Sequence, residues 1–387
     1  MKVALVHDDF MQWGGAERVV EAMAEVWPDA PIYTIAYNDR VLPPNFPKER
    51  LRTSLLHKPL LKKLFYPHFF FLDPLFFELM NFNEFDVVIS SSTRFSKSVV
   101  TQPKTLHISY INSPPRFLWP VSTYFGPRHY AQGFIQKLPF IARPLAQLCI
   151  NPLLTLLRMH DYTAAQRIDY LIGNSKNVAK RINKFYERDA DVIYPSVELE
   201  RFEVNNQQLA VNNKQFDKGY FLIVSRLSKH KRVDLAIEAF NELGWKLKII
   251  GTGSDGDYFK KIANPNIEFF DYLPDQDVVE YIRHCKAFLY PQEEDFGITA
   301  IEAQAMGKPV VAYKAGGALE TIVDGETGIF FDAQTKESLI AALKKCNEMV
   351  FDEQKIKQNA QRFSRERFKE EMKKYVEEKF EYRNSKY

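Results

Sequence analysis

Short runs of apolar residues alternate with stretches of helical periodicity along most of the chain. Runs of four to six apolar residues separated by helices are typical of parallel strands that helices cover on both faces. One series of runs lies at residues 3–6, 32–36, 86–90, 106–110, 170–173 and 192–194, and a second at 220–225, 246–250, 267–270, 287–290 and 309–312. The pattern therefore predicts an α/β protein with two doubly wound, Rossmann-like parallel sheets.

The expected domain boundary lies in residues 198–218, which are rich in Asn, Gln and charge and lack any periodic pattern. We therefore expect a first domain over residues 1–198 and a second over residues 199–367. Residues 368–387 form a helical pattern with charges of both signs three and four positions apart. Such a helix can cross back to the first domain, which is the arrangement we expect, or it can be a solvated surface helix.

The length of 387 residues agrees with two domains, because single cores stop growing at about 250–300 residues. Fifty-two Lys and Arg against 49 Asp and Glu leave a net charge of +3, which lacks the basic excess of a dedicated nucleic-acid binder. Cys149, Cys285 and Cys346 are far apart in the sequence, which favours reduced thiols. The chain opens on a strand rather than on a signal-peptide pattern, and no window has the ~20 apolar residues of a membrane span, so we expect a cytoplasmic location.

In open parallel sheets, ligands bind beyond the carboxyl ends of the strands, and two facing domains would place a ligand in the cleft between them. The first strand runs into Gly14-Gly15 at the start of a helix, where backbone N–H groups can approach an anion closely. The glycines do not form the G-x-G-x-x-G pattern of dinucleotide binding, which disfavours a nicotinamide-dependent dehydrogenase. A plain turn before a helix explains the two glycines equally well.

The first two strands of the second domain are also followed by residues suited to phosphate. Arg226 and Lys231 lie in the basic stretch after the first of these strands, and their guanidinium and ammonium groups suit a diphosphate. The alternative is a solvated basic loop that binds no ligand. Gly251-Thr-Gly253 follows the next strand, and the two glycines indicate either a phosphate contact or a tight turn.

The sequence Glu294-Asp-Phe296-Gly297-Ile298-Thr-Ala-Ile-Glu302 is the most specific signal. Gly297 marks a turn before a helix whose amino terminus can stabilise an anion, and the two glutamates can accept hydrogen bonds from hydroxyls. Eight helical residues would separate these glutamates by about 12 Å. A glycosidase needs its carboxyl groups about 5–9.5 Å apart, so the pair fits two ends of an extended ligand better. An exposed acidic helix cap is the alternative.

With these residues the chain resembles the retaining glycosyltransferases of family 4, which have the GT-B fold. The likeness rests on the Glu294-x(7)-Glu302 spacing, Arg226, Lys231, the diglycine, and residues 174–182, 194–197, 294–311 and 316–320. The stretch 108–119 is similar to enzymes that build bacterial surface polysaccharides, including many mannosyltransferases. The resemblance implies transfer of a hexose, with mannose-like sugars favoured, from a GDP- or UDP-sugar to a glycan or polyprenol-linked acceptor with retained configuration. It also implies an acceptor-side first domain and a nucleotide-sugar-binding second domain.

The resemblance assigns roles to residues by matching motif. Arg226 and Lys231 would hold the diphosphate, Glu294 a hydroxyl of the donor sugar, and Glu302 the ribose. The remaining donor contacts would come from Gly14, Gly15, Gly251, Gly253, Phe296, Gly297 and Ile298.

Similar enzymes commonly carry a His where this chain has Asn112, and His107 lies five residues earlier. We expect Asn112 to take that His's place among the catalytic residues, because it follows the strand whereas His107 lies inside it. Arg116 and Trp119 are then acceptor-side candidates, together with His107.

No D-x-D motif follows a strand end, so we expect neither a metal nor another cofactor. Fixed cations and a helix terminus can stabilise the leaving diphosphate instead. Two other classes stay open, a nucleotide-sugar epimerase and a non-catalytic nucleotide-sugar binder.

Residues 48–80 combine basic and aromatic side chains. Residues 64–77 contain six phenylalanines, and the basic residues that precede them are Lys48, Arg50, Arg52, Lys58, Lys62 and Lys63. Such a combination suits docking on an anionic membrane, which would place the enzyme peripherally on the inner face of the plasma membrane. An internal helical hairpin with aromatic residues in the core is the alternative.

Overall fold

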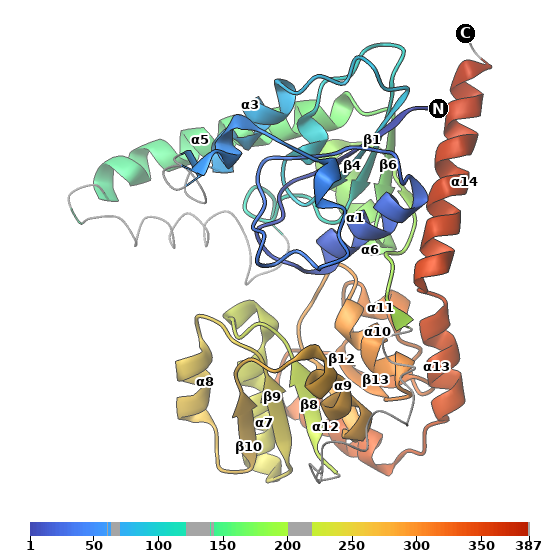
Figure 1. Cartoon of the computed structure of the whole chain (residues 1–387). Coiled ribbons are helices and arrows are strands. Elements are labelled where there is room, and N and C mark those ends of the chain that lie inside the picture. The colour runs from blue at the N-terminus through green and yellow to red at the C-terminus, as the bar shows by residue number, and fades with distance from the viewer. Residues whose placement is uncertain (60, 63–69, 121–139, 141–142, 200–218, 386–387) are drawn as a thin grey trace. The chain divides into compact units, whose positions relative to one another are not determined.

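The computed structural model describes residues 1–59, 61–62, 70–120, 140, 143–199 and 219–385. The chain divides into two compact units, Met1–Ser196 with Glu366–Tyr387 and Val197–Arg365 (Figure 1). Each of the boundaries expected from the sequence lies two residues from one of these limits.

The first unit contains a seven-stranded sheet in the order β3-β2-β1-β4-β5-β6-β7, and every neighbouring pair of strands is parallel. The order runs outward in both directions from β1 and β4, as a doubly wound sheet requires. The strands are β1 (Val3–His7), β2 (Ile32–Thr34), β3 (Leu51–Thr53), β4 (Val87–Ser92), β5 (Leu106–Ile111), β6 (Tyr170–Gly173) and β7 (Asp191–Val192).

Helices cover both faces of this sheet. They are α1 (Gly15–Val26), α3 (Asp73–Glu78), α5 (Arg143–Gln166), α6 (Lys176–Tyr186) and the part of α14 (Arg365–Asn384) that belongs to this unit, with short 3₁₀ helices at Lys48–Arg50, Leu55–His57, Phe70–Leu72 and Ser96–Ser98. Alternate residues of β1 enter different layers: Val3 and Leu5 join the core that contains α1, whereas Ala4 and Val6 join the core that contains α3 and α5. This alternation is the two-residue period of a strand buried on both faces.

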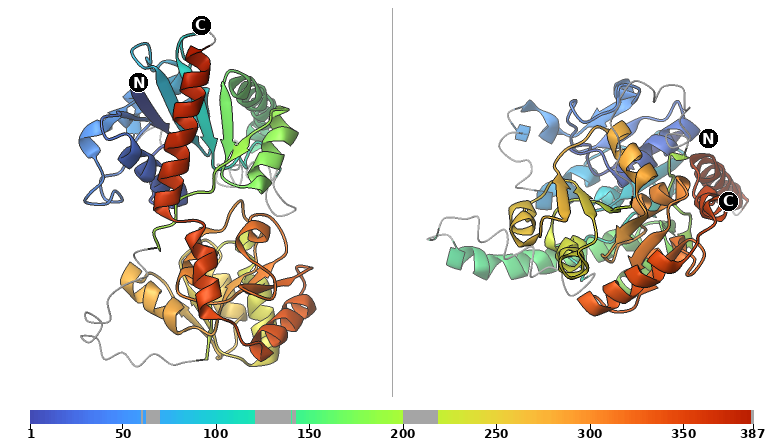
Figure 2. Two further views of the ribbon diagram at one scale, coloured as in Figure 1. Left: turned by 90° about the vertical axis from the view of Figure 1, so that its right-hand side faces the viewer. Right: turned by 90° about the horizontal axis from the view of Figure 1, so that it is seen from below.

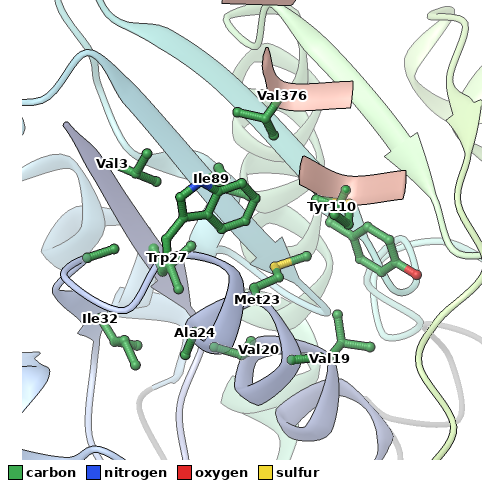
Figure 3. Close-up of a cluster of buried hydrophobic side chains, with 14 of the residues drawn as sticks. Val3, Val19, Val20, Met23, Ala24, Trp27, Ile32, Ile89, Tyr110 and Val376 are labelled. Atoms are coloured by element: carbon green, nitrogen blue, oxygen red, sulfur yellow. The ribbon is translucent and has the colours of Figure 1, made fainter. Parts of the chain in front are cut away.

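Helix α14 buries an apolar stripe in the first of these cores. Phe368, Met372 and Val376 are spaced by four residues and are fully buried, which is the spacing of one helix face. The Tyr110 ring packs edge-on against Phe368 with 5.8 Å between the ring centroids. Figure 3 shows Val376 in the same cluster as Tyr110 and the α1 side chains, and Figure 2 shows the helix along the first unit's sheet. Helix α14 is therefore part of the first unit's core layer.

The second unit has a six-stranded parallel sheet in the order β10-β9-β8-β11-β12-β13. Its strands are β8 (Phe221–Val224), β9 (Leu247–Ile250), β10 (Ile267–Phe270), β11 (Ala287–Tyr290), β12 (Val310–Tyr313) and β13 (Gly328–Phe331). Its helices are α7 (Val233–Leu243), α8 (Gly256–Ile262), α9 (Asp275–His284), α10 (Ile298–Ala305), α11 (Ala318–Thr321), α12 (Lys336–Glu348), α13 (Glu353–Gln361) and the 3₁₀ helix Lys229–Lys231. The two doubly wound parallel sheets predicted from the sequence are thus confirmed.

Candidate functional site

In the second unit, the strand order reverses between the neighbouring strands β8 and β11. Ligands of doubly wound sheets bind at such a switch point, beyond the carboxyl ends of the strands. The loop after β8 carries Lys231 and the loop after β11 carries Glu294, and the Lys231 ammonium contacts the Glu294 carboxylate. The two side chains are 21% and 12% exposed, so the ion pair is mostly sheltered and still reachable from solvent.

The two loops of this switch point are also joined through Gln334. Arg232 adopts a left-handed conformation at the start of α7, and its guanidinium donates to the Gln334 side-chain oxygen at 2.9 Å. The Gln334 amide in turn donates to the Pro291 carbonyl at 3.1 Å. Sequence reasoning missed this bridge, because Gln334 is more than 40 residues from Pro291 and lies in no motif.

Arg226 is the second residue after β8, and its side chain is exposed. Its backbone carbonyl accepts from the Ser228 N–H at 3.0 Å, which closes the turn toward Lys231. Arg226 and Lys231 are thus in one short loop at the switch point.

Gly251 and Gly253 let the loop after β9 lie against the loop after β8. A Cβ atom on Gly251 would be 1.9 Å from the Ser225 carbonyl oxygen, and one on Gly253 would be 2.1 Å from that of Leu227. The Leu227 N–H donates to the Thr252 carbonyl at 2.9 Å between the two loops. The tight-turn interpretation therefore has a direct packing reason, and a phosphate contact by these glycines stays a prediction.

The loop after β12 holds the Glu294 loop in the same way. The Gly317 N–H donates to the Glu294 carbonyl at 2.8 Å. A Cβ atom on Gly316 would be 2.3 Å from that carbonyl oxygen, and one on Gly317 would be 2.3 Å from the Phe296 Cα. The diglycine at 316–317 therefore sets the position of the loop that carries Glu294.

The rest of the Glu294 motif leads into α10. Phe296 is buried and packs edge-on against Phe363, with 5.4 Å between the ring centroids. Gly297 has φ = +100°, which favours glycine. Ile298 is the first residue of α10, and Glu302 lies half-buried one turn further along.

In the first unit, the strand order reverses between β1 and β4. The Asp8 carboxylate, directly after β1, accepts hydrogen bonds of 2.6–2.9 Å from the backbone N–H groups of residues 93–96 and from the Thr93 hydroxyl. Burial raises the pKa of Asp8, but Arg94, His7 and these N–H groups outweigh it and leave the pKa below its usual value. Asp8 thus ties the loop after β4 to the loop after β1, and its place at a strand end was the only sequence signal for it.

The diglycine at 14–15 lies at the amino terminus of α1, as predicted. Gly14 has extended backbone angles, and its N–H donates to the Glu17 carboxylate at 2.9 Å. The Gly14 N–H, which we expected to approach an anion, is therefore already paired within the protein.

Asn112 and His107 lie at different depths in the first unit. Asn112 follows β5 at the carboxyl edge, where its side-chain amide donates to the Ser91 hydroxyl at 2.9 Å and its backbone carbonyl accepts from the Asn174 side-chain amide at 2.8 Å. His107 is buried within β5, and its Nε2 is 3.0 Å from the Ser90 hydroxyl. Burial lowers the pKa of His107 to about 4, so its imidazole is neutral near pH 7.

Trp119 belongs to a buried polar cluster. Its indole N–H donates to the Asp161 carboxylate at 2.7 Å, and its ring stacks on Phe185 with 5.0 Å between centroids. Asp161 also pairs with the buried Lys97 at 2.5 Å and accepts from the Tyr186 hydroxyl at 2.8 Å. These contacts give Trp119 a packing role, while Arg116 is half-buried three residues earlier.

Among the described residues, no group of three His, Cys, Asp or Glu is arranged to hold a metal ion.

Residues 204–363 match the family model "Glycosyl transferases group 1". The chain is 28% identical over 171 residues to the capsular polysaccharide biosynthesis glycosyltransferase CapM of Staphylococcus aureus, covering 41% of this chain and 44% of that protein. It is 26% identical over 225 residues to the alpha-1,3/1,6-mannosyltransferase ALG2 of Dictyostelium discoideum, covering 47% and 53%. The chain therefore spans about half the length of the curated relatives it matches.

Two solved structures share the fold over nearly the whole chain. The lipopolysaccharide outer core galactosyltransferase WaaB has a TM-score of 0.65 at 17% identity, covering 98% of this chain and 100% of that one. Anabaena HepE, determined with UDP-glucose, has a TM-score of 0.65 at 18% identity with the same coverage. The chain thus has the GT-B fold, and its residues 204–363 match the glycosyl transferases group 1 family.

Proposed function

We propose that this protein transfers a hexose from a nucleotide diphosphate sugar to an acceptor hydroxyl with retained anomeric configuration. The observation that carries the proposal is the contact between Lys231 and Glu294 at the switch point of the second unit. This pair lies inside the residues that match the family.

The geometry supports a division of roles at this site. The sheltered Lys231 ammonium and the exposed Arg226 guanidinium belong to one loop, and both can stabilise the charge that develops on a leaving diphosphate. The Glu294 carboxylate, held by Lys231, can accept from a sugar hydroxyl. Glu302 on α10 would accept from the ribose, and the amides of residues 296–298 would meet the donor.

The names of the similar proteins support a more specific proposal for the donor and the acceptor. ALG2 is named a mannosyltransferase, CapM a capsular polysaccharide enzyme, and HepE was determined with UDP-glucose. We therefore propose a GDP- or UDP-hexose donor, with mannose-like sugars favoured, and a glycan or polyprenol-linked glycan acceptor in surface polysaccharide synthesis.

The test is incubation of the full chain with radiolabelled UDP-glucose, UDP-galactose or GDP-mannose, each with polyprenol-linked glycan acceptors and with or without EDTA. An extended acceptor whose new linkage retains the donor configuration is the expected result, and EDTA should leave its yield unchanged. An epimerised sugar without extension would identify an epimerase instead. Donor binding alone would indicate a non-catalytic binder.

Gly317→Ala is expected to lower transfer activity by about 10²-fold, because a shift of roughly 1 Å in a catalytic loop has an effect of that size. The new Cβ would lie 2.3 Å from the Phe296 Cα, and backbone cannot move aside as a flexible side chain can. Transfer rate and melting temperature should be measured together. Gly256→Ala is the control, since its Cβ would be 3.4 Å from a Leu227 methyl, an ordinary contact. Equal rates in both variants would contradict the assigned role of Gly317.

Asn112→Ala is expected to reduce the transfer rate, whereas Asn112→His should retain activity and add a pH dependence near 6–7, about the pKa of a free His. Asn112 is at the carboxyl edge of the sheet, where ligands of this fold bind. The measurement is the pH profile of kcat. A silent Asn112→Ala together with a damaging His107→Ala at full thermal stability would move the role to His107.

We propose that residues 48–80 contain the membrane-binding surface. The structure removes two of the expected residues, Arg50 and Phe77, from it. The Arg50 guanidinium donates to the carbonyls of Ala24, Trp27 and Ala30, so it supports the fold. Phe77 is buried, which favours the core alternative for that ring, and Lys63 and residues 64–69 lie outside the described residues. Lys58 is exposed, and among the described residues of this stretch Leu55, Leu75 and Leu79 are exposed apolar side chains. No helix of the described parts of the chain is long and apolar enough to cross a bilayer.

Liposome flotation is expected to show binding to highly anionic vesicles at low salt, and Lys58→Glu with Leu79→Ser should weaken it severalfold. Lys344→Glu is the control, because Lys344 is an exposed lysine on α12 in the second unit. Absence of binding to anionic vesicles would favour the packed hairpin.

A further inference from the structure

A buried chain of polar contacts connects the diglycine turn of the first unit to its sheet. His7 ends β1 and is 1% exposed. Its Nδ1 is 3.0 Å from the Ser91 carbonyl oxygen on β4, and its Nε2 is 3.9 Å from Glu17 Oε1 on α1. The second Glu17 oxygen, Oε2, accepts from the Gly14 N–H at 2.9 Å. The Ser91 hydroxyl also accepts from the Asn112 amide.

The Ser91 carbonyl determines the protonation pattern of His7. A carbonyl oxygen can only accept, so Nδ1 must carry a hydrogen, and Nε2 is the atom that gains or loses a proton. At 3.9 Å, Nε2 is too far from Glu17 for a direct hydrogen bond and close enough for an ion pair. Protonated His7 therefore attracts the carboxylate, whereas neutral His7 presents a lone pair to it.

We infer that His7 and Glu17 form a proton-dependent positioning pair that holds the Gly14–Gly15 turn in place. With His7 protonated, Glu17 is attracted toward β1 and its other oxygen restrains the Gly14 N–H. When His7 loses its proton, the attraction is lost and the turn is released. The consequence for catalysis rests on the proposed function, since the turn is expected to meet the donor.

The surroundings of His7 set the direction of its titration. Glu17 faces it from α1, Asp8 and Asp9 follow it in its own loop, and the Phe10 ring centroid is 4.9 Å away. Arg94, from the loop after β4, pairs with Asp9. Burial lowers the pKa of His7, but the contributions of Glu17, Asp8 and Asp9 exceed it and leave the pKa raised above 6.5. His7 is therefore mostly protonated at pH 6.5, and its attraction to Glu17 is lost as the pH rises through that raised pKa.

The Glu17→Gln variant distinguishes a charge-dependent His7–Glu17 pair from an ordinary helix cap. The Gln side-chain oxygen can still accept from the Gly14 N–H, as an N3 Glu or Gln does in a capping box, but the charge that attracts His7 is gone. A residue that only caps the helix would tolerate this change, whereas a charge-dependent pair would not.

The experiment is NMR titration of the full chain labelled with ¹³C-histidine and ¹⁵N-glycine, with His7 assigned through His7→Gln. We expect His7 to titrate with a midpoint above 6.5 and the Gly14 amide signal to move with the same midpoint. In Glu17→Gln, the His7 midpoint should fall below 6.5. His107 is the internal reference, because it is equally buried but faces the Ser90 hydroxyl, and it should stay neutral above pH 5.

Two outcomes overturn the inference: a Gly14 signal that stays constant through the His7 midpoint, or an unchanged His7 midpoint in Glu17→Gln. If Glu17→Gln does not fold, His7→Gln decides, since it should abolish the pH dependence of the Gly14 signal. With an active donor, kcat of the wild type should fall about threefold or more across the His7 midpoint, in line with the effect of a displaced contact loop, and Glu17→Gln should lose this step. If the protein turns over no donor, the proposed function is wrong. The NMR titration then still tests whether His7 and Glu17 form a proton-dependent pair.

Discussion

Glu294→Gln is expected to lower the rate of sugar transfer by about 10²–10³ and to leave the unfolding temperature near that of the wild type. Removal of one preorganised polar group from a transfer site typically has this effect on rate. The substitution removes the charge that pairs with Lys231 but keeps the size of the side chain. The Gln side-chain oxygen can still accept from the Lys231 ammonium, so we expect only a small change in stability. Steady-state kinetics with the active donor and a thermal melt provide the measurement.

Arg226→Ala should reduce the rate to a similar extent, because Arg226 lies in the same loop as Lys231. Asp332→Asn is a matched control: it removes a carboxylate from an ion pair with Lys314 in the same unit, 3.0 Å long and well exposed. That variant should remain within twofold of the wild type, as expected for an exposed pair. Activity of Glu294→Gln within about threefold of the wild type would remove Glu294 from the site.

The free energy of unfolding is expected to contain a contribution from His107 that falls by about 3 kcal/mol as the pH decreases from 6.5 to 4. Burial lowers the pKa of His107 to about 4 in the native state, whereas the unfolded chain has a His pKa of about 6.5. Between these values the unfolded chain binds a proton that the native protein does not bind. Stability from this group is therefore present above pH 6.5 and is lost as the pH falls.

Urea denaturation at pH 4.5, 5.5 and 6.5 gives the free energy of unfolding at each pH. This free energy should change less with pH in His107→Gln than in the wild type. Asp73 provides a control of opposite sign. Burial raises its pKa to about 7, so the native protein binds the extra proton, and stability from this group is lost as the pH rises. Asp73→Asn should therefore steepen the loss of stability toward acid. Identical pH slopes for the wild type and His107→Gln would show that His107 is not held neutral.

The positions of most strands could be predicted from the sequence, because a strand buried on both faces needs a continuous apolar run. The runs at 3–6, 106–110 and 287–290 correspond to β1, β5 and β11. β3 and β13, which are one edge strand of each sheet, were not predicted from the sequence. In β3, Arg52 and Thr53 are exposed, so an edge strand with one solvated side lacks the continuous run that identifies a central strand.

The loops that carry the candidate site were also predictable, since the carboxyl ends of parallel strands meet at one edge of a sheet. Which side chains meet there was not. Lys231 and Glu294 are 63 residues apart in sequence and come into contact because β8 and β11 are neighbours, which strand order decides and local pattern does not show. The same holds for Gly317, which lies against Phe296 because β11 and β12 are neighbours. The sequence by itself thus determined most of the strands and the loop chemistry, because these depend on local patterns. Only the tertiary structure decided which loops touch, because those contacts depend on the order in which the strands assemble.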